Sequence, residues 1–259
     1  LAIVHVPQPR ASLDGQKSQG SLWKEAVYGF KYIFTRPGLR GLVSLFLVAN
    51  LFSGMAWTVF APFILSRTGN DSVIFGSVQT AAAIGGVAGG ILMSAWGGFK
   101  RRIHGILGVW LISNLIGMPA FGLGNNLWIW IPSIMIVTLL GPVVVGSSQA
   151  IWQSKVTPDV QGRVFAARRL IAWITQPVAP IIAGLLADHL LEPAMQTSGG
   201  SLAELFGRFV GTGPGSGMSL LFIFAGLAIA LIALLGYFIP SIRDIETPLP
   251  DHDQVQSAH

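Results

Sequence analysis

The stretch SLLFIFAGLAIALIALLGYFIP, residues 219–240, contains no side chain between its two ends that is more polar than Tyr237. A helix of about 20 apolar residues crosses the roughly 30 Å hydrocarbon layer of a membrane, since it rises about 1.5 Å per residue. Similar runs recur along the chain, and each keeps Asp, Glu, Lys and Arg out of its middle. The runs cover residues 42–65, 73–96, 105–123, 127–153, 170–190 and 218–240. Because backbone groups in lipid must bond internally, the sequence predicts an all-α membrane protein with six transmembrane helices.

The composition of the 259 residues favours the same class. Only 10% of the residues are charged and 52% are hydrophobic, with a mean hydropathy of +0.63, whereas a soluble domain carries about 25% charged residues. These values exclude an ordinary soluble enzyme and a disordered chain. The lack of cysteine excludes a disulfide scaffold, cysteine-ligated zinc and thiol catalysis. Since the chain opens with Leu1 in a polar segment, we expect it to be part of a longer protein.

The cations fall almost entirely on one side of the predicted topology. Of the 16 Lys and Arg residues, all but Arg67 and Arg208 lie before the first span, in alternate loops, or after the sixth span. Lys and Arg are retained on the cytoplasmic side, so this pattern predicts that both termini are cytoplasmic. Topology thus accounts for the net charge of +5 and the isoelectric point near 10.0, and we do not expect nucleic acid as a partner.

Two flanking segments surround the predicted bundle of residues 41–240. Residues 1–40 are expected to be a cytoplasmic segment, and within residues 21–35 the apolar side chains recur at helical spacing opposite a charged face. This helix is predicted to lie among the headgroups of the cytoplasmic leaflet or, alternatively, to dock on a missing partner domain. Residues 241–259 are predicted to be a disordered cytoplasmic tail.

Polar side chains inside the spans share faces, and a polar face in a membrane helix is directed to protein or water. The first span has three such residues at spacing i, i+3 and i+7, the fourth and fifth pair glutamine with tryptophan, and the second offers one glutamine. The predicted cavity-lining residues are Asn50, Ser53, Trp57, Gln79, Gln149, Trp152, Gln153, Trp173 and Gln176. Amides beside indoles suit bulky amphipathic organic molecules. For each single residue, the alternative is a hydrogen bond to a neighbouring helix, worth about 0.6–2 kcal/mol.

Glycine and proline mark places where helices approach or bend. Small residues four apart let helix backbones come close and slide, and proline removes a backbone donor and kinks a helix. The predicted packing and kink residues are Gly85, Gly86, Gly89, Gly90, Gly141, Pro142, Pro177 and Pro180. They favour a protein that rocks between two shapes, with a static glycine-packed bundle as the alternative.

Patterns of catalysis and metal binding are missing from the sequence. It has no GxxxxGK[ST] loop for ATP, no His paired with a carboxylate at ligand spacing, and no triad companions near Ser147 and Ser148. No carboxylate falls near the middle of a span, where a proton relay is expected. We therefore expect no enzyme, catalytic residue, cofactor or metal, and we expect any acid that couples protons to transport to lie outside these residues.

Two loops carry motifs. GGFKRR, residues 97–102, joins spans two and three, and TPDVQGRV, residues 157–164, joins spans four and five. Together with the six spans, they resemble the C-terminal half of a major facilitator superfamily transporter, and more narrowly its macrolide-efflux and siderophore-exporter branch. Residues 1–9 then resemble the end of helix six, and residues 10–40 the central cytoplasmic loop. The Asp usual in the family's Gly and basic loop motif is absent from residues 97–102.

The resemblance implies two six-helix halves that rock about a site near the middle of the membrane and expose it to each side in turn. It implies that spans one, two, four and five line the cavity or the interface between halves, while spans three and six are peripheral. The lack of a polar face on span six agrees with that position. Residues with an implied role in the cytoplasmic gate or loop motif are Gly98, Lys100, Arg101, Arg102, Arg163 and Arg168. For each of them, a plain determinant of topology is the alternative.

From these observations we expect a multi-pass secondary transporter of the bacterial plasma (inner) membrane. It is expected to export an amphipathic small molecule, such as a drug, a macrolide or a siderophore, by ion-coupled alternating access, as in an antiporter. The expected partners are the lipid bilayer, a small organic substrate and the missing N-terminal six-helix half. The alternatives are a non-transporting membrane anchor or interaction module from a truncated gene, and an importer of the same fold.

Overall fold

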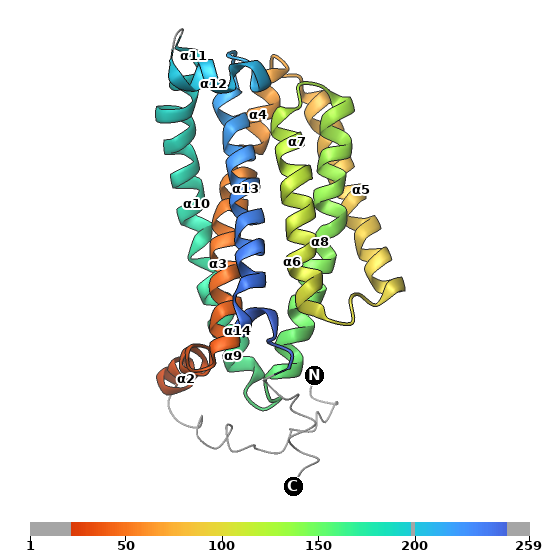
Figure 1. Cartoon of the computed structure of the whole chain (residues 1–259), viewed down its shortest axis with the longest axis vertical. Coiled ribbons are helices and arrows are strands. Elements are labelled where there is room, and N and C mark those ends of the chain that lie inside the picture. Colours follow the sequence, from red (N-terminus) through yellow and green to blue (C-terminus); the bar gives the residue numbers. More distant parts are fainter. Residues whose placement is uncertain (1–21, 198–199, 248–259) are drawn as a thin grey trace, which may run out of the picture.

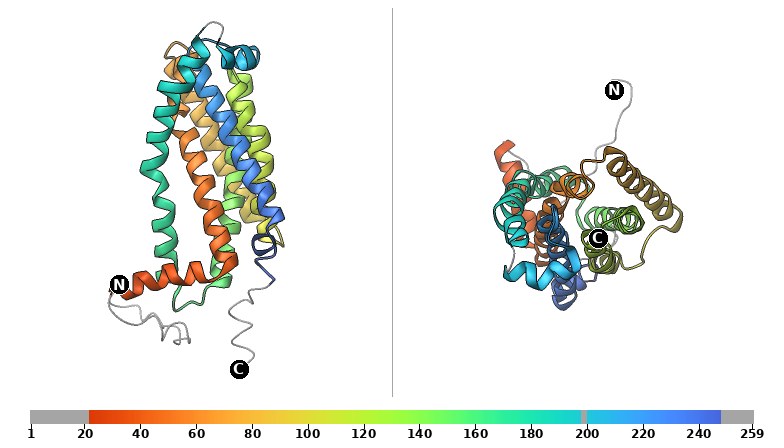
Figure 2. Two further views of the ribbon diagram at one scale, coloured as in Figure 1. Left: turned by 60° about the vertical axis from the view of Figure 1, so that its left-hand side comes forward. Right: turned by 90° about the horizontal axis from the view of Figure 1, so that it is seen from above.

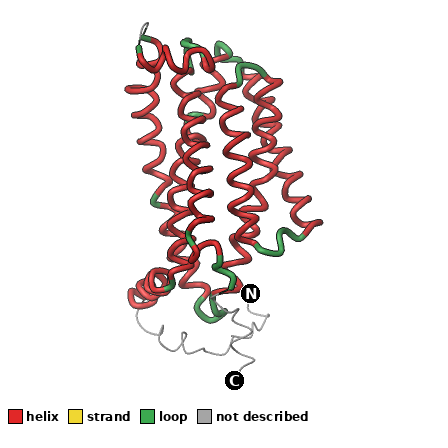
Figure 3. The backbone as a smooth tube through the Cα atoms, viewed as in Figure 1, coloured by secondary structure: helices red, strands yellow, loops and turns green. Residues whose placement is uncertain are grey.

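Helices make up nearly all of the regular structure in the computed structural model, which describes residues 22–197 and 200–247 (Figure 1). No strand occurs among those residues (Figure 3). Six helical segments are long and apolar enough to cross a membrane. They are Pro37–Arg67, Ser72–Trp96, Arg102–Leu123, Leu127–Lys155, Gln161–Gln196 and Ser216–Phe238. The chain is an all-α membrane helical bundle, which confirms the predicted fold class.

Shorter helices build these six segments. In chain order the segments contain α3 (Pro37–Thr58) and α4 (Phe60–Arg67); α5 (Ser72–Trp96); α6 (Arg102–Ile112), η1 (Ser113–Gly117) and α7 (Met118–Leu123); α8 (Leu127–Lys155); α9 (Gln161–Trp173), α10 (Thr175–Gly184), η2 (Leu185–Leu191) and α11 (Glu192–Gln196); and α13 (Ser216–Phe238). Outside the segments lie α2 (Leu22–Thr35), α12 (Ser201–Val210) and α14 (Pro240–Arg243). The fifth segment begins at Gln161 rather than at residue 170, because the helix continues through an arginine-rich stretch beyond the apolar run.

Side-chain caps and a glycine set where two of the long helices begin and end. The Asp71 carboxylate accepts the backbone N–H groups of Val73 and Ile74, at 2.8 and 3.1 Å, and so caps the start of α5. Gly97 ends α5 in the left-handed region, with φ of 79°. The Asn126 side chain accepts the N–H of Ile129 at the start of α8. Short polar residues between apolar runs therefore place the turns at the membrane surfaces.

Two π-helical segments each end two residues before a proline. In η1 the N–H of Met118 reaches back five residues to Ser113, just before Pro119. In η2 the N–H of Glu192 reaches back to Ala187 in the same way, just before Pro193. Because proline cannot donate to the carbonyl four residues earlier, the neighbouring turn widens and the bonding register shifts by one residue.

The predicted proline kinks have different outcomes. Helix α8 runs unbroken through Pro142, so the Gly141–Pro142 pair does not interrupt it. The fifth segment is interrupted at Ile174, three residues before Pro177, where α9 ends and α10 begins. Pro180 lies inside α10. Near the fifth-segment site, Ile174 separates α9 from α10 while keeping helical dihedrals, with φ of −55° and ψ of −34°.

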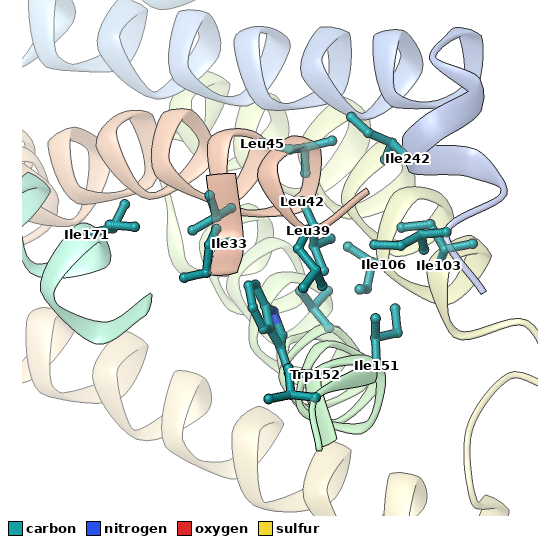
Figure 4. Close-up of a cluster of buried hydrophobic side chains, with 14 of the residues drawn as sticks. Ile33, Leu39, Leu42, Leu45, Ile103, Ile106, Ile151, Trp152, Ile171 and Ile242 are labelled. Atoms are coloured by element: carbon teal, nitrogen blue, oxygen red, sulfur yellow. The ribbon is translucent and has the colours of Figure 1, made fainter. Parts of the chain in front are cut away.

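Buried side chains form two apolar clusters, one toward each end of the bundle. The lower cluster packs aliphatic residues from α2, α3, α6, α8 and α14 around the buried ring of Trp152 (Figure 4). The upper cluster is aromatic: the ring centroid of Phe63 lies 5.6 Å from Phe121, 5.9 Å from Trp130 and 5.2 Å from Phe222. The middles of α3, the third segment and α8 lie between these two clusters.

Helices α13 and α5 occupy contrasting positions. Helix α13 packs against α3, α6 and α7, and half of its most apolar window is buried. The large side chains that it exposes are all apolar: Phe224, Leu227, Leu231, Leu234, Leu235 and Phe238. Helix α5 instead lies at the edge of the bundle and packs chiefly on α8 (Figure 1). Only 22% of its window is buried, and the faces that it exposes include polar residues.

Segments outside the spans close the lower end of the bundle. Helix α2 lies across this end (Figure 2) and packs on α9 of the same chain, which buries Tyr32 and Ile33. Val27 and Phe34 of α2 remain exposed. The tail prediction is wrong for residues 241–247, because α14 and buried Ile245 dock on the bundle and the Lys155 ammonium donates to the Glu246 carbonyl at 2.8 Å. The rest of the predicted tail, residues 248–259, and residues 1–21 lie outside the described residues.

Candidate functional site, a cavity along helix α3

Polar residues gather in the gap between the two apolar clusters. On α3 the buried members of the lower cluster end at Leu45 and those of the upper cluster begin at Met55. On the third segment the corresponding limits are Val109 and Met118, and α8 has a similar gap. These gaps fall halfway along the helices, so polar side chains from three spans meet at the middle depth of the bundle.

One space in this gap is a cavity of about 300 Å³ between α3, the third segment and α8. Its wall includes three residues of the predicted α3 face, Asn50, Ser53 and Trp57. Aromatic rings continue the wall, since Phe46 and Trp110 lie with their ring centroids 4.7 Å apart and their planes tilted by 54°. This first cavity therefore brings the Asn50 amide and the Ser53 hydroxyl together with the rings of Phe46, Trp57 and Trp110.

Two further cavities meet the first one at Asn50. The second, of about 360 Å³, lies between α3 and α10 and is lined by Ser53, Trp57, Gln176 and Pro180 among others. The third, of about 60 Å³, lies lower, between α3, α8 and α9. Its wall consists of Val43, Phe46, Leu47, Asn50, Trp152, Arg168, Ile171 and Ala172. Asn50 lines all three cavities and is the residue that connects them.

The polar groups of the cavities differ in whether their bonds are already used. Ser113 donates to the Val109 carbonyl and Asn114 to the Trp110 carbonyl, so these side chains are satisfied by their own helix. In contrast, neither Asn50 nor Gln176 has a side-chain hydrogen bond to any of the described residues. Their amides are free to bind water or a ligand, whereas Ser113 and Asn114 donate to backbone carbonyls of their own helical segment.

The predicted face on α8 is tied to α9 by a cation. One guanidinium nitrogen of Arg168 donates to the Gln149 side-chain oxygen at 3.2 Å, and the other donates to the Ser148 hydroxyl at 3.0 Å. The same guanidinium lies 5.1 Å from the Trp152 ring centre, within cation–π range. Trp152 itself is only 1% exposed and belongs to the lower cluster. It reaches only the smallest cavity rather than the large ones.

Three predicted cavity residues lie away from this site. Trp173 is 60% exposed on the outer surface of α9, and Gln153 is exposed near the lower end of α8. Gln79 is exposed on α5, which packs chiefly on α8. None of them lines the three cavities that meet at Asn50. The sequence periodicity grouped them with the cavity because it shows which residues share a face, not what that face meets.

Some cavity residues were not among the sequence candidates. Phe46 extends the predicted α3 face by one turn at spacing i, i+4, i+7 and i+11, so a longer periodic window would have found it. Trp110 and Thr138 gave no such signal, because a single aromatic or hydroxyl residue is common in a membrane helix. Gly141 lines the first cavity, and a side chain added at this position would meet open space among the described residues.

The glycines of α5 divide between two faces. A side chain at Gly85 would collide with Thr138, and one at Gly89 would collide with the Leu139 carbonyl. Gly86 and Gly90 face open space within the described part of the chain. Only the first pair packs α5 onto α8.

The predicted gate residues fall into separate contacts. Arg102 donates to the Ala150 carbonyl of α8 at 3.0 Å, and Arg163 pairs with Glu25 of α2 at 3.2 Å. Lys100 and Arg101 are exposed. Gly98 has a φ of 86°, which favours glycine. Of these residues, only Arg168 lines one of the three described cavities that meet at Asn50.

Titratable groups outside the spans form no metal site. No group of three His, Asp or Glu residues within 22–197 and 200–247 lies close enough to hold a metal ion. At the lower end, hydrogen bonds from Arg243 lower the pKa of Asp244. This ion pair lies on the surface next to α14, and neither residue lines the three cavities.

Comparison with known proteins gives one distant similarity. The chain is 28% identical over 161 residues to macrolide efflux protein A of Streptococcus pyogenes, and equally to that of S. pyogenes serotype M6 (strain ATCC BAA-946 / MGAS10394). The match covers 58% of this chain and 38% of each relative, so the chain spans well under half the length of the curated relatives it matches. No family model matches the sequence, and no solved structure matches it significantly. The chain thus combines six helices long and apolar enough to cross a membrane with a distant similarity to an efflux protein.

Proposed function

We propose that the chain is the C-terminal six-helix half of a secondary carrier that exports amphipathic small molecules across the bacterial plasma membrane. The cavities that meet at Asn50 would form this half's share of the substrate site. Alternating access follows when two halves rock about a site at the middle depth of the membrane.

The observation that carries this proposal is the unbonded amide of Asn50 at the junction of the three cavities. A free amide inside a membrane bundle is costly unless it serves water or a ligand. Around it stand the rings of Phe46, Trp57 and Trp110, which supply stacking surface. A few polar groups in an otherwise apolar wall are typical of a site for amphipathic organic molecules.

The half-protein assignment is supported by where polar residues are exposed. Gln79 and Thr80 on α5 and Gln176 on α10 are exposed at positions inside spanning segments. Lipid would leave such groups without hydrogen bonds, so a second protein surface suits them better. The large apolar side chains exposed by α13 need no such cover. The match covers only 38% of the relative's length, which agrees with the presence of a second half in the complete protein.

The orientation proposed is cytoplasmic for the end that carries α2, α9 and α14. Every Lys and Arg in the described residues lies at this end except Arg67 and Arg208. Ion coupling is also proposed, and its titrating acid is placed in the other half, because the three cavities contain no Asp or Glu from the described residues.

The test replaces Asn50 by leucine in the complete protein, in everted membrane vesicles energised by a pH gradient. Loss of one neutral hydrogen bond, about 0.5–1.5 kcal/mol, predicts roughly threefold to tenfold weaker accumulation of amphipathic dyes and macrolides. The control is Gln153→Leu, which changes an exposed amide that lines none of these cavities and should leave accumulation unchanged. Equal transport by N50L and Q153L would contradict the site, and no transport of any compound by the complete protein would contradict the function.

A further inference from the structure

We infer that Arg168 forms a subsite for an oxyanion, so that the carrier takes amphipathic molecules with an acidic head group, such as a carboxylate, in preference to cations. This inference rests on the proposed function and names the substrate class of the same cavity. Arg168 lies about two turns into α9 and is the only charged residue on the walls of the three described cavities that meet at Asn50.

The contacts of Arg168 within the described residues are all neutral. Its guanidinium donates to the Gln149 amide oxygen and the Ser148 hydroxyl and stands over the Trp152 ring. Arg168 lies two residues before the apolar run of residues 170–190 and is partly buried, and neutral acceptors compensate only part of the cost of burying a cation. The fork of the guanidinium also matches a carboxylate or phosphate in two parallel bonds, which a single amide oxygen does not use.

Three other arginines have an acid nearby, whereas Arg102 bonds the Ala150 carbonyl and the Ser154 hydroxyl away from the cavities. Arg163 pairs with Glu25, Arg243 with Asp244, and Arg67 is attracted by Glu192. No carboxylate of the described residues lies within ion-pairing distance of Arg168. Arg168 combines neutral partners with a place on a cavity wall, and its charge is therefore available for an anionic ligand.

The surroundings of Arg168 also fit the rest of such a ligand. Phe46 and Trp152 stand on the same small cavity and offer ring faces next to the charge. Above them, Asn50 joins this space to the two larger cavities of about 300 and 360 Å³. An amphipathic acid can therefore place its head group at Arg168 and its apolar body along α3 toward Trp57.

The experiment compares three probes that differ only in their end group: 1-pyrenebutyrate, 1-pyrenebutanol and 1-pyrenebutylammonium. Saturable binding is measured to the complete protein in nanodiscs of zwitterionic lipid, with empty nanodiscs subtracted to remove partition into lipid. We expect the anion to bind at least about tenfold more tightly than the alcohol, with the cation weakest. This tenfold preference corresponds to about 1.4 kcal/mol.

Three variants locate the preference. R168Q should bind the anion and the alcohol equally, R168K should keep part of the preference because it retains charge without the fork, and R169Q should behave as wild type. Arg169 is the matched control because it is adjacent, exposed and lines none of the three cavities. Retained pyrenebutanol binding shows that each variant is folded.

The outcomes separate this inference from the proposed function. Equal binding of anion and alcohol by the wild type, or a preference for the cation, would overturn the inference and indicate that an acid of the other half neutralises Arg168. An anion preference that survives in R168Q would overturn it as well. In both cases saturable binding of the alcohol would leave the proposed cavity intact. Failure of all three probes to bind saturably would overturn both. If R168Q does not fold, R168K and the wild-type probe series still decide the inference.

Discussion

At the scale of single residues, one carboxylate organises the upper end of the bundle. The two oxygens of Glu192 accept the N–H groups of Gly215 and Gly217, at the start of α13. These amides have no partner within the helix, and the helix dipole favours a negative charge there. Beside them Arg67 donates to the Ser219 hydroxyl at 2.7 Å and to the Val210 carbonyl. The first, fifth and sixth spans are thus joined by hydrogen bonds at this end.

Replacing Glu192 by glutamine should lower the free energy of unfolding by about 1–3 kcal/mol. Glutamine keeps one acceptor oxygen and loses the charge, and hydrogen bonds to a charged group are worth about 1.5–3 kcal/mol. The measurement is the Tm of the purified protein in detergent. Glu204→Gln is the control, since Glu204 is exposed on α12. A Tm for E192Q that equals that of E204Q would show that the Glu192 contacts contribute little to stability.

At the scale of elements, the contact of α5 with α8 depends on the face that its glycines present. The backbone of α5 approaches Leu139 and Thr138 of α8 at Gly89 and Gly85, with no room for a methyl group. Gly86 and Gly90 lie one residue further along, where the helix has turned by about 100° and faces open space in the described chain. The glycine repeat of α5 predicts close packing. The position of α8 decides which pair of glycines makes the contact.

Gly89→Ala should separate α5 from α8 and destabilise the protein, whereas Gly90→Ala should be tolerated. The new methyl group of G89A meets the Leu139 carbonyl, which is backbone and cannot rotate away, so a cost of about 1–3 kcal/mol is expected for overpacking. Alanine at position 90 meets nothing and gains helix propensity, by about 0.5–1 kcal/mol relative to glycine. Thermal unfolding of both variants of the 259-residue chain gives the comparison. Equal Tm values would mean that α5 does not pack on α8 as described.

At the scale of the whole molecule, the distribution of charge orients the bundle. The loops and helices at one end carry nearly all the described cations, and the opposite end has only Arg67 and Arg208. Cytoplasmic loops retain Lys and Arg, so the end with α2 and α14 is predicted to face the cytoplasm. The chain contains no natural cysteine, which makes single-cysteine labelling straightforward.

Lys100→Cys and Ser72→Cys test this orientation, because both positions are exposed and lie at opposite ends of α5. In intact cells a membrane-impermeant maleimide should label S72C and not K100C, and permeabilised cells should show labelling of both. Labelling of K100C from outside, with S72C protected, would reverse the topology.

Several features of this protein follow from local sequence alone. The apolar runs specify the six membrane helices, because lipid accepts only long segments with internally bonded backbones. The spacing of Asn50, Ser53 and Trp57 places them on one face of α3, since residues three and four apart lie on the same side of a helix. The structure sets this face against the cavities, while its role in binding substrate stays a prediction.

Only the tertiary structure decided what each face meets. Trp152 and Trp173 look alike in the sequence, yet one is buried in the lower cluster and the other lies on the outer surface. The docking of residues 241–247, and the neutral surroundings of Arg168, likewise depend on contacts between residues far apart in the chain. Helical periodicity fixes the relative direction of side chains on one helix but not the rotation of that helix against its neighbours. That rotation is set by packing between helices, which no short stretch of sequence contains.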